Sequence, residues 1–292
     1  MMQADPFAFA SLLAEQILKG EGVGKLPIDP KAFARAKDIE VVAKPTSSAG
    51  VSGMLVRSGN EFAIAYATHL ENEGFENFSV GHELGHFFLP GHMDAVIPGG
   101  SGMHESRAGF NSKDRYEAEA DRFSAGFLMP RFLFFPATET AGSGLAAIEA
   151  LATLCKTSLH ATAIRYAQCT REPVAVIISV GSRIDHCFLS EALKQASGID
   201  RLRKHEAVPR GTATHAFNQD SNNVKKAARV EESCNLQDWF GGKRSLPIGE
   251  DVLGLGRYGK TLTVLHSIKL PDAEEEEDEA ALIESWTPRF KR

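Results

Sequence analysis

Apolar residues recur at helical spacing near the start of the chain and then follow a strand-like pattern. Residues 7–20 carry apolar side chains three or four positions apart, and Gly20 is typical of a helix end. Residues 54–57 and 61–67 resemble two strands, and Ser58-Gly59-Asn60 between them is typical of a turn. The sequence therefore predicts a helix followed by a β-hairpin.

Two further helices are predicted on either side of a segment rich in Gly, Ser and Pro. An apolar stripe at helical spacing runs from Phe75 to Leu89, and Pro90-Gly91 ends it. A second helix is expected from Arg115 to Met129, where Pro130 stops it. We expect residues 91–113 between them to form an irregular loop.

The second half of the chain has a different character. Residues 144–169 predict two helices that resemble a helix-turn-helix, and from Pro173 onward runs such as PVAVIISV predict strands. We place a domain boundary near residue 172. One glutamate against one lysine and one arginine gives 144–169 a net charge of only +1, which is small for an element that reads DNA. We favour a packing or partner-docking role and expect no direct DNA binding.

Charge and cysteine usage narrow the class of protein. The formal net charge is −6, and the acidic run at 274–279 alone contributes six negative charges, so the rest is nearly neutral, unlike a nucleic-acid-binding surface. The four cysteines form no CxxC pair, which favours a reducing cytoplasm. The N-terminus is a poor signal peptide, and no apolar run is long enough to span a membrane. We therefore expect a soluble cytoplasmic protein with an acidic linker, after which Trp286 and Phe290 are candidates to dock onto the body.

The residues His82-Glu83-Leu84-Gly85-His86 form an HExxH motif on the predicted helix 75–89. Side chains four residues apart lie on one helix face, so His82 and His86 can reach the same metal ion. Glu83 projects about 100° away from His82, close enough to touch a water on the metal without binding the metal itself. The motif predicts two metal ligands and a general base.

A catalytic zinc ion usually takes three protein ligands, so a third ligand is needed. The second helix offers Glu117, and Asp121 one turn later can accept a hydrogen bond from the outer nitrogen of a ligand histidine. Glu119 is a rival ligand, but it points about 200° away from Glu117 on a helix, and we rank it lower.

Three aromatic or histidine side chains near the motif are weaker candidates. His104 and His92 could polarise a substrate carbonyl or stabilise the oxyanion, but we favour the ordinary interpretation of surface-loop histidines. Tyr116 adjoins Glu117, and we expect it to pack in the core. The strand 61–67 could bind an extended substrate if it lies at a sheet edge, and otherwise it is a core strand with Phe62, Ile64 and Tyr66 facing inward.

The segments GHELGHFFLPGH at 81–92 and YEAEADRFSAGFLMP at 116–130 resemble the ImmA/IrrE family of bacterial and phage zinc metallopeptidases. The resemblance is specific over residues 75–130 and weaker from residue 10 to about 170. It implies that His82, His86 and Glu117 bind zinc and that Glu83 is the general base. Asp121 stands where many members have Asn, and either side chain can orient a histidine.

We predict an α+β protein with four parts. They are a zincin-like metallopeptidase domain at 1–140, a helical, helix-turn-helix-like connector at 141–172, a mixed α/β domain at 173–270 and an acidic linker with a tail at 271–292. The third part resembles a GAF-like domain only in its length and strand-rich character.

The resemblance implies a zinc-dependent endopeptidase that cleaves a helix-turn-helix repressor and so controls a stress, phage or mobile-element response. One Zn²⁺ per chain is expected, with another divalent ion as the alternative. The first rival is a non-proteolytic regulator that keeps the metal and inactivates a repressor by binding it. Another is a sensor whose C-terminal domain binds a small molecule and gates the protease.

Overall fold

The computed structural model describes residues 6–44, 50–107, 114–196, 199–242 and 246–269. The acidic run at 274–279, Trp286 and Phe290 lie outside the described residues. The chain divides into two compact units, Met1–Thr170 and Arg171–Arg292. Over the described residues, no helix combines the length and the apolar character needed to cross a membrane.

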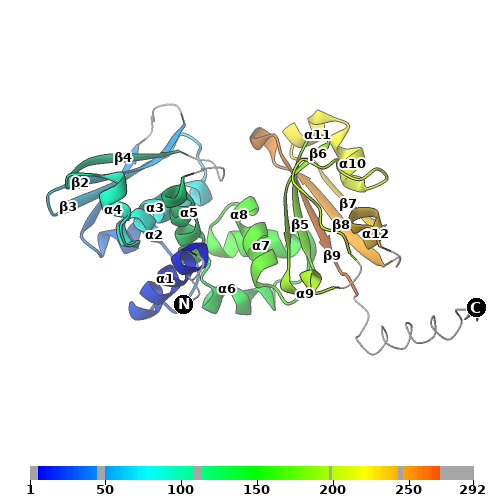
Figure 1. The fold of residues 1–292 in the computed structure, drawn as a ribbon, viewed down its shortest axis with the longest axis horizontal. Helices are drawn as coiled ribbons and strands as arrows, with labels where there is room; N and C mark the ends of the chain where they lie inside the picture. Colours follow the sequence, from blue (N-terminus) through cyan, green and yellow to red (C-terminus); the bar gives the residue numbers. More distant parts are fainter. Residues whose placement is uncertain (1–5, 45–49, 108–113, 197–198, 243–245, 270–292) are drawn as a thin grey trace, which may run out of the picture. The chain divides into compact units, whose positions relative to one another are not determined.

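The first unit alternates helices with the strands of one four-stranded sheet (Figure 1). Its elements in chain order are α1 Pro6–Gly20, α2 Pro30–Arg35, β1 Ile39–Lys44, β2 Val51–Ser58, β3 Glu61–Ala67, α3 Glu73–Phe88, α4 His92–Val96, β4 Ser101–Arg107, α5 Arg115–Leu128, α6 Arg131–Thr138, α7 Gly144–Cys155 and α8 Leu159–Cys169. The predicted hairpin is formed by β2 and β3, which pair from Gly53 opposite Tyr66 to Ser58 opposite Glu61.

The strand order of this sheet is β1-β3-β2-β4, with β1 parallel to β3 and the other pairs antiparallel. The prediction that 91–113 is an irregular loop is wrong, because 92–96 form α4 and 101–107 form β4. The sequence of β4, SGMHESR, has no apolar alternation, and backbone pairing with β2 holds it in place. The edge position considered for 61–67 is also wrong, since β3 pairs on both sides.

The helices α3 and α5 pack closely because small residues face each other between them. A Cβ atom on Gly81 would lie 2.6 Å from Ser124 Oγ, and one on Gly85 would lie 3.0 Å from Ala120 Cα. Larger side chains at these positions would separate the helices. His82 and His86 each directly follow one of these glycines, so the close approach brings both histidines toward α5.

Side chains fix where the helices α3 and α5 begin. Asn72 accepts a hydrogen bond from Phe75 N at the start of α3, and Asp114 accepts one from Tyr116 N at the start of α5. Both bonds satisfy backbone donors that a helix leaves free in its first turn. The HExxH motif therefore lies in the interior of α3, and Glu117 lies in the first turn of α5.

The two helices predicted over 144–169 are α7 and α8, and α7 ends at Lys156 in the left-handed region. The arginine of α8, Arg165, donates to Met129 O at 2.8 Å and to Glu15 Oε1 at 3.0 Å. Because these hydrogen bonds engage the guanidinium of Arg165 within the first unit, it is not available to bind a phosphate group.

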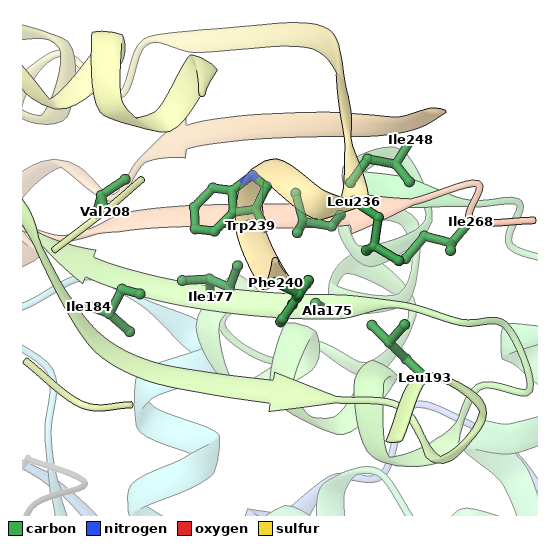
Figure 2. Packing of buried hydrophobic residues seen from close by; sticks show 11 residues of the cluster. Ala175, Ile177, Ile184, Leu193, Val208, Leu236, Trp239, Phe240, Ile248 and Ile268 are labelled. Atoms are coloured by element: carbon green, nitrogen blue, oxygen red, sulfur yellow. The ribbon is translucent and has the colours of Figure 1, made fainter. Parts of the chain in front are cut away.

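The second unit is a five-stranded antiparallel sheet with short helices, and its strand order is β6-β5-β9-β8-β7. Its elements are β5 Ala175–Val180, β6 Arg183–Leu189, α9 Glu191–Lys194, α10 Ala213–Asn218, α11 Ser221–Lys225, β7 Arg229–Asn235, α12 Leu236–Phe240, β8 Pro247–Gly254, η1 Gly256–Tyr258 and β9 Thr261–His266. Trp239 and Phe240 of α12 pack on Ala175 and Ile177 of β5 (Figure 2).

A buried carboxylate fixes α10 to this sheet. Glu250 on β8 accepts hydrogen bonds from Thr214 N at 2.8 Å and from Thr214 Oγ1 at 2.7 Å. Its side chain has no exposed surface, so these bonds compensate for the cost of burying the charge. The α+β class predicted from the sequence is confirmed, whereas the GAF-like character of this unit stays a prediction.

Candidate metal centre

The side chains of His82 and His86 on α3 converge with that of Glu117 on α5. One ligand atom from each residue lies within 4.8 Å of the other two. His82 Nε2 is 3.3 Å from Glu117 Oε2, His86 Nε2 is 3.3 Å from Glu117 Oε1, and the two Nε2 atoms are 3.1 Å apart. A tetrahedral site with metal–ligand bonds of about 2.0–2.1 Å has edges of roughly 3.3 Å, so the spacing suits a single ion.

The outer nitrogen of each histidine has its own partner. His82 Nδ1 lies 2.8 Å from Asp121 Oδ1, and His86 Nδ1 lies 3.2 Å from His92 Nδ1. When Nδ1 of a neutral histidine carries the proton, Nε2 presents a lone pair. The two Nε2 atoms and the Glu117 carboxylate then all present lone pairs to the same point, an arrangement that suits a cation.

The electrostatics of the cluster suit a cation, which has to displace a proton from His82. Burial lowers the pKa of His82, but hydrogen bonds with Asp121 and Glu117 outweigh this effect and raise it to about 10. Burial raises the pKa of the Glu117 carboxyl, but hydrogen bonds with His104, His82 and His86 outweigh this effect and hold the pKa far below its usual range. Burial lowers the pKa of His86 to about 4, which keeps this imidazole neutral. The cluster thus combines an ionised carboxylate with imidazole nitrogens, a donor set that fits a divalent metal ion.

Glu83, the predicted general base, is fully buried beside this cluster. Neither of its carboxylate oxygens has a hydrogen-bond partner among the described residues. Burial raises its pKa to about 7, against the opposing effects of the His82 charge and of the nearby Ser106 hydroxyl, which likewise has no well-formed hydrogen bond among the described residues. A buried carboxyl without a partner is costly, which is expected where a polar ligand or a water completes the site.

A glycine on the neighbouring strand makes room for this carboxyl group. A Cβ atom on Gly53 of β2 would overlap Glu83 Oε1 and would lie 3.2 Å from Glu83 Cδ. The side chain of Glu83 therefore occupies space that any other residue at position 53 would fill. This role of Gly53 leaves no signal in the sequence, because the contact joins a strand and a helix.

His104 lies on β4 and faces the metal cluster, so the favoured interpretation of a surface-loop histidine is wrong. Its Nε2 is 2.9 Å from Glu117 Oε1, and its ring centroid is 4.7 Å from that of His86. It is not one of the three residues whose ligand atoms converge. Its place beside the cluster suits contact with a substrate oxygen.

His92 is buried on α4, with 1% of its surface exposed, so the surface-loop interpretation is wrong here as well. Its Nε2 lies 3.0 Å from Glu119 Oε2, which places Glu119 outside the converging ligand set. Burial lowers the pKa of His92, and the hydrogen bond to Glu119 opposes that shift. The spacing could have drawn attention to His92, since it follows His86 by six residues, as in HExxHxxGxxH, although Leu89 replaces the glycine.

Tyr116 is not a core residue, because 38% of its surface is exposed. Its ring meets the edge of the His92 ring with centroids 5.0 Å apart. The expectation of core packing is therefore wrong. Tyr116 instead covers the outer side of His92.

A helix that carries HExxH beside a carboxylate-bearing second helix and a small sheet is the arrangement of zincin-like metallopeptidases. Residues 34–166 match the family model of the M78 peptidases, described as the IrrE N-terminal-like domain. The matched range includes every residue of the metal cluster and its outer partners.

A Mycobacterium tuberculosis transcriptional regulator is among the solved structures similar to this chain. The two share 15% sequence identity with a TM-score of 0.55, over 88% of this chain and 76% of the other. At this identity the similarity shows a common fold and nothing about activity. No curated protein sequence matches the chain.

Proposed function

We propose that this protein is a zinc-dependent endopeptidase of the cytoplasm that cleaves a helix-turn-helix transcriptional repressor. The observation that carries the peptidase proposal is the buried Glu83 carboxyl, which has no hydrogen-bond partner in the described part of the chain and lies beside the converging atoms of His82, His86 and Glu117. The repressor as substrate rests on the family resemblance. The structurally similar Mycobacterium tuberculosis protein is a transcriptional regulator, which agrees with a role in gene control.

Two imidazoles and one carboxylate favour zinc over harder ions such as Mg²⁺, with Mn²⁺ or another divalent ion as the alternative. When bound, zinc polarises the scissile carbonyl and lowers the pKa of a water molecule to near 7. Glu83 takes the proton of the attacking water and passes it to the leaving amine, and its pKa of about 7 suits both transfers. Asp121 holds His82 in the tautomer that leaves Nε2 free.

The position of β4 suggests how a peptide binds. β4 closes one side of the described sheet, and His104 on this strand lies beside Glu117. An extended substrate that pairs with the outer edge of β4 would run next to the metal cluster. His104 would then donate a hydrogen bond to the substrate oxygen as negative charge develops on it.

The experiment that tests the proposal is co-expression of the chain with the helix-turn-helix repressor encoded nearest to it. We expect the repressor to be shortened, and the masses of the fragments to locate the cleaved bond. With the purified protein, 1,10-phenanthroline should stop repressor cleavage and added zinc should restore it. A repressor that stays intact while co-purifying with the protein would contradict the peptidase and favour a regulator that acts by binding.

Replacing Gly53 with alanine is expected to lower kcat/KM for repressor cleavage by roughly 100-fold, because a misplaced reacting group costs about this much. The three atoms nearest to the new methyl group would all belong to Glu83, so the methyl group would displace the Glu83 carboxyl, which is not one of the converging ligands. The zinc content should therefore equal that of the wild type. Gly24→Ala is the matched control, since a Cβ atom there meets nothing within 4 Å. Equal cleavage rates for the two variants would remove the role given to Gly53.

A further inference from the structure

The two ligand histidines are supported from behind in different ways. His82 meets a carboxylate directly, with its Nδ1 2.8 Å from Asp121 Oδ1. His86 meets another histidine instead, with its Nδ1 3.2 Å from His92 Nδ1. The carboxylate, Glu119, comes one step later, 3.0 Å from His92 Nε2. Behind His86, the support is therefore a chain of two residues.

The hydrogen-bond chemistry of this chain allows a single consistent arrangement of protons when His86 binds a metal through Nε2. His86 then carries its proton on Nδ1 and donates it to His92 Nδ1. His92 must carry its own proton on Nε2, and it donates that proton to the Glu119 carboxylate. Each group of the chain is satisfied, and both imidazoles are neutral.

The surroundings hold this chain in place. His92 is 1% exposed and Glu119 is 7% exposed, so water does not compete strongly for their hydrogen bonds. The second oxygen of Glu119 accepts from Arg115 Nε at the surface, whereas the Tyr116 ring only touches the His92 ring and makes none of the hydrogen bonds of the chain. Arg115, Tyr116 and Glu119 all lie in the first two turns of α5, the helix that also provides Glu117.

We propose that His92 and Glu119 are positioning residues that orient His86 and increase its affinity for the metal ion, although neither touches the metal. This inference rests on the proposed metal site. His92 is not itself a third ligand, because it contacts His86 at Nδ1, on the side of the ring away from the converging Nε2 atoms. Although His92 follows His86 by only six residues, it therefore lies behind the His86 ring, on the side away from the proposed metal position.

The test measures the zinc dissociation constant by competition with a chromophoric chelator, using full-length protein. His92→Phe keeps a ring of similar size but removes both hydrogen bonds, and we expect zinc to bind about 10–100-fold more weakly. His92→Gln can accept from His86 and donate to Glu119 through one amide, so it should recover part of the loss. Tyr116→Leu removes only the ring contact and is the control, with an expected change of less than about twofold.

Combining variants shows whether His92 and Glu119 act on His86 as one chain or independently. Glu119→Gln should weaken zinc binding, and His92→Phe with Glu119→Gln should be no weaker than His92→Phe alone, because the carboxylate acts through His92. The loss from Asp121→Asn should instead add to that of His92→Phe, since Asp121 supports the other histidine. The visible spectrum of bound Co²⁺ gives a second readout and should change for His92→Phe but not for Tyr116→Leu.

Wild-type zinc affinity in His92→Phe, or full additivity of the His92 and Glu119 losses, would overturn the inference. If His92→Phe fails to fold, Glu119→Gln and His92→Gln carry the same test. Failure of the metal site is distinguishable, because the wild type itself would then bind neither zinc nor Co²⁺.

Discussion

Replacing Glu83 with glutamine is expected to lower kcat/KM for repressor cleavage by roughly 10²–10⁴-fold, the range that general acid–base catalysis contributes. Glutamine has nearly the same shape as glutamate, so it fits beside Gly53. It cannot accept the proton of the attacking water. Because no metal ligand changes, the variant should bind as much zinc as the wild type, which metal analysis of the purified protein would show.

The same variant separates catalysis from binding. If the protein cleaves its repressor, Glu83→Gln should still bind the repressor and should trap it intact in a complex isolated by size-exclusion chromatography. Glutamine also removes a buried carboxyl that has no partner among the described residues, so the variant should be no less stable than the wild type. Full cleavage by Glu83→Gln would show that another group activates the water.

The hairpin and the two long helices were predictable because their apolar spacing reports which face is buried. In β3, Ile64 is fully buried, as the strand pattern predicts, and in α3 Val80 and Leu84 are fully buried on the helical stripe. Strand β4 left no such trace, because its residues are almost all polar and its place depends on hydrogen bonds to β2. Pairing between distant backbone segments cannot be read from the side chains of one of them.

The residues of the site also divide into those that the sequence predicts and those that it does not. His82, Glu83 and His86 were predicted because local helix geometry alone brings them to one region. His92 required tertiary information, since its burial depends on the docking of α4 near α5. Gly53 is similar, because its function becomes visible only when β2 lies against Glu83. Glu117 and Asp121 also lie on another element, but their helical spacing on α5 made them recognisable, whereas no local pattern reports the contacts of His92 and Gly53.

Replacing Glu117 with glutamine is expected to weaken zinc binding by more than about 100-fold, the upper end of the loss for an outer partner. Glu117 provides the only carboxylate of the converging set, and both its oxygens lie 3.3 Å from a ligand nitrogen. A neutral amide keeps the shape but loses the negative charge that attracts the cation. The change should appear in chelator competition and also in thermal unfolding.

Thermal unfolding gives an independent measure because an ion that binds only the folded protein stabilises it. At zinc concentrations about 100 times the wild-type dissociation constant, the stabilisation is about 2.7 kcal/mol, and it should nearly disappear in Glu117→Gln. Glu105→Gln is the matched control, since Glu105 is exposed and next to His104 on β4 but is not among the converging residues. If zinc stabilised Glu117→Gln as much as the control, the third ligand would have to be another residue, and His104, 2.9 Å from Glu117, would be the first to test.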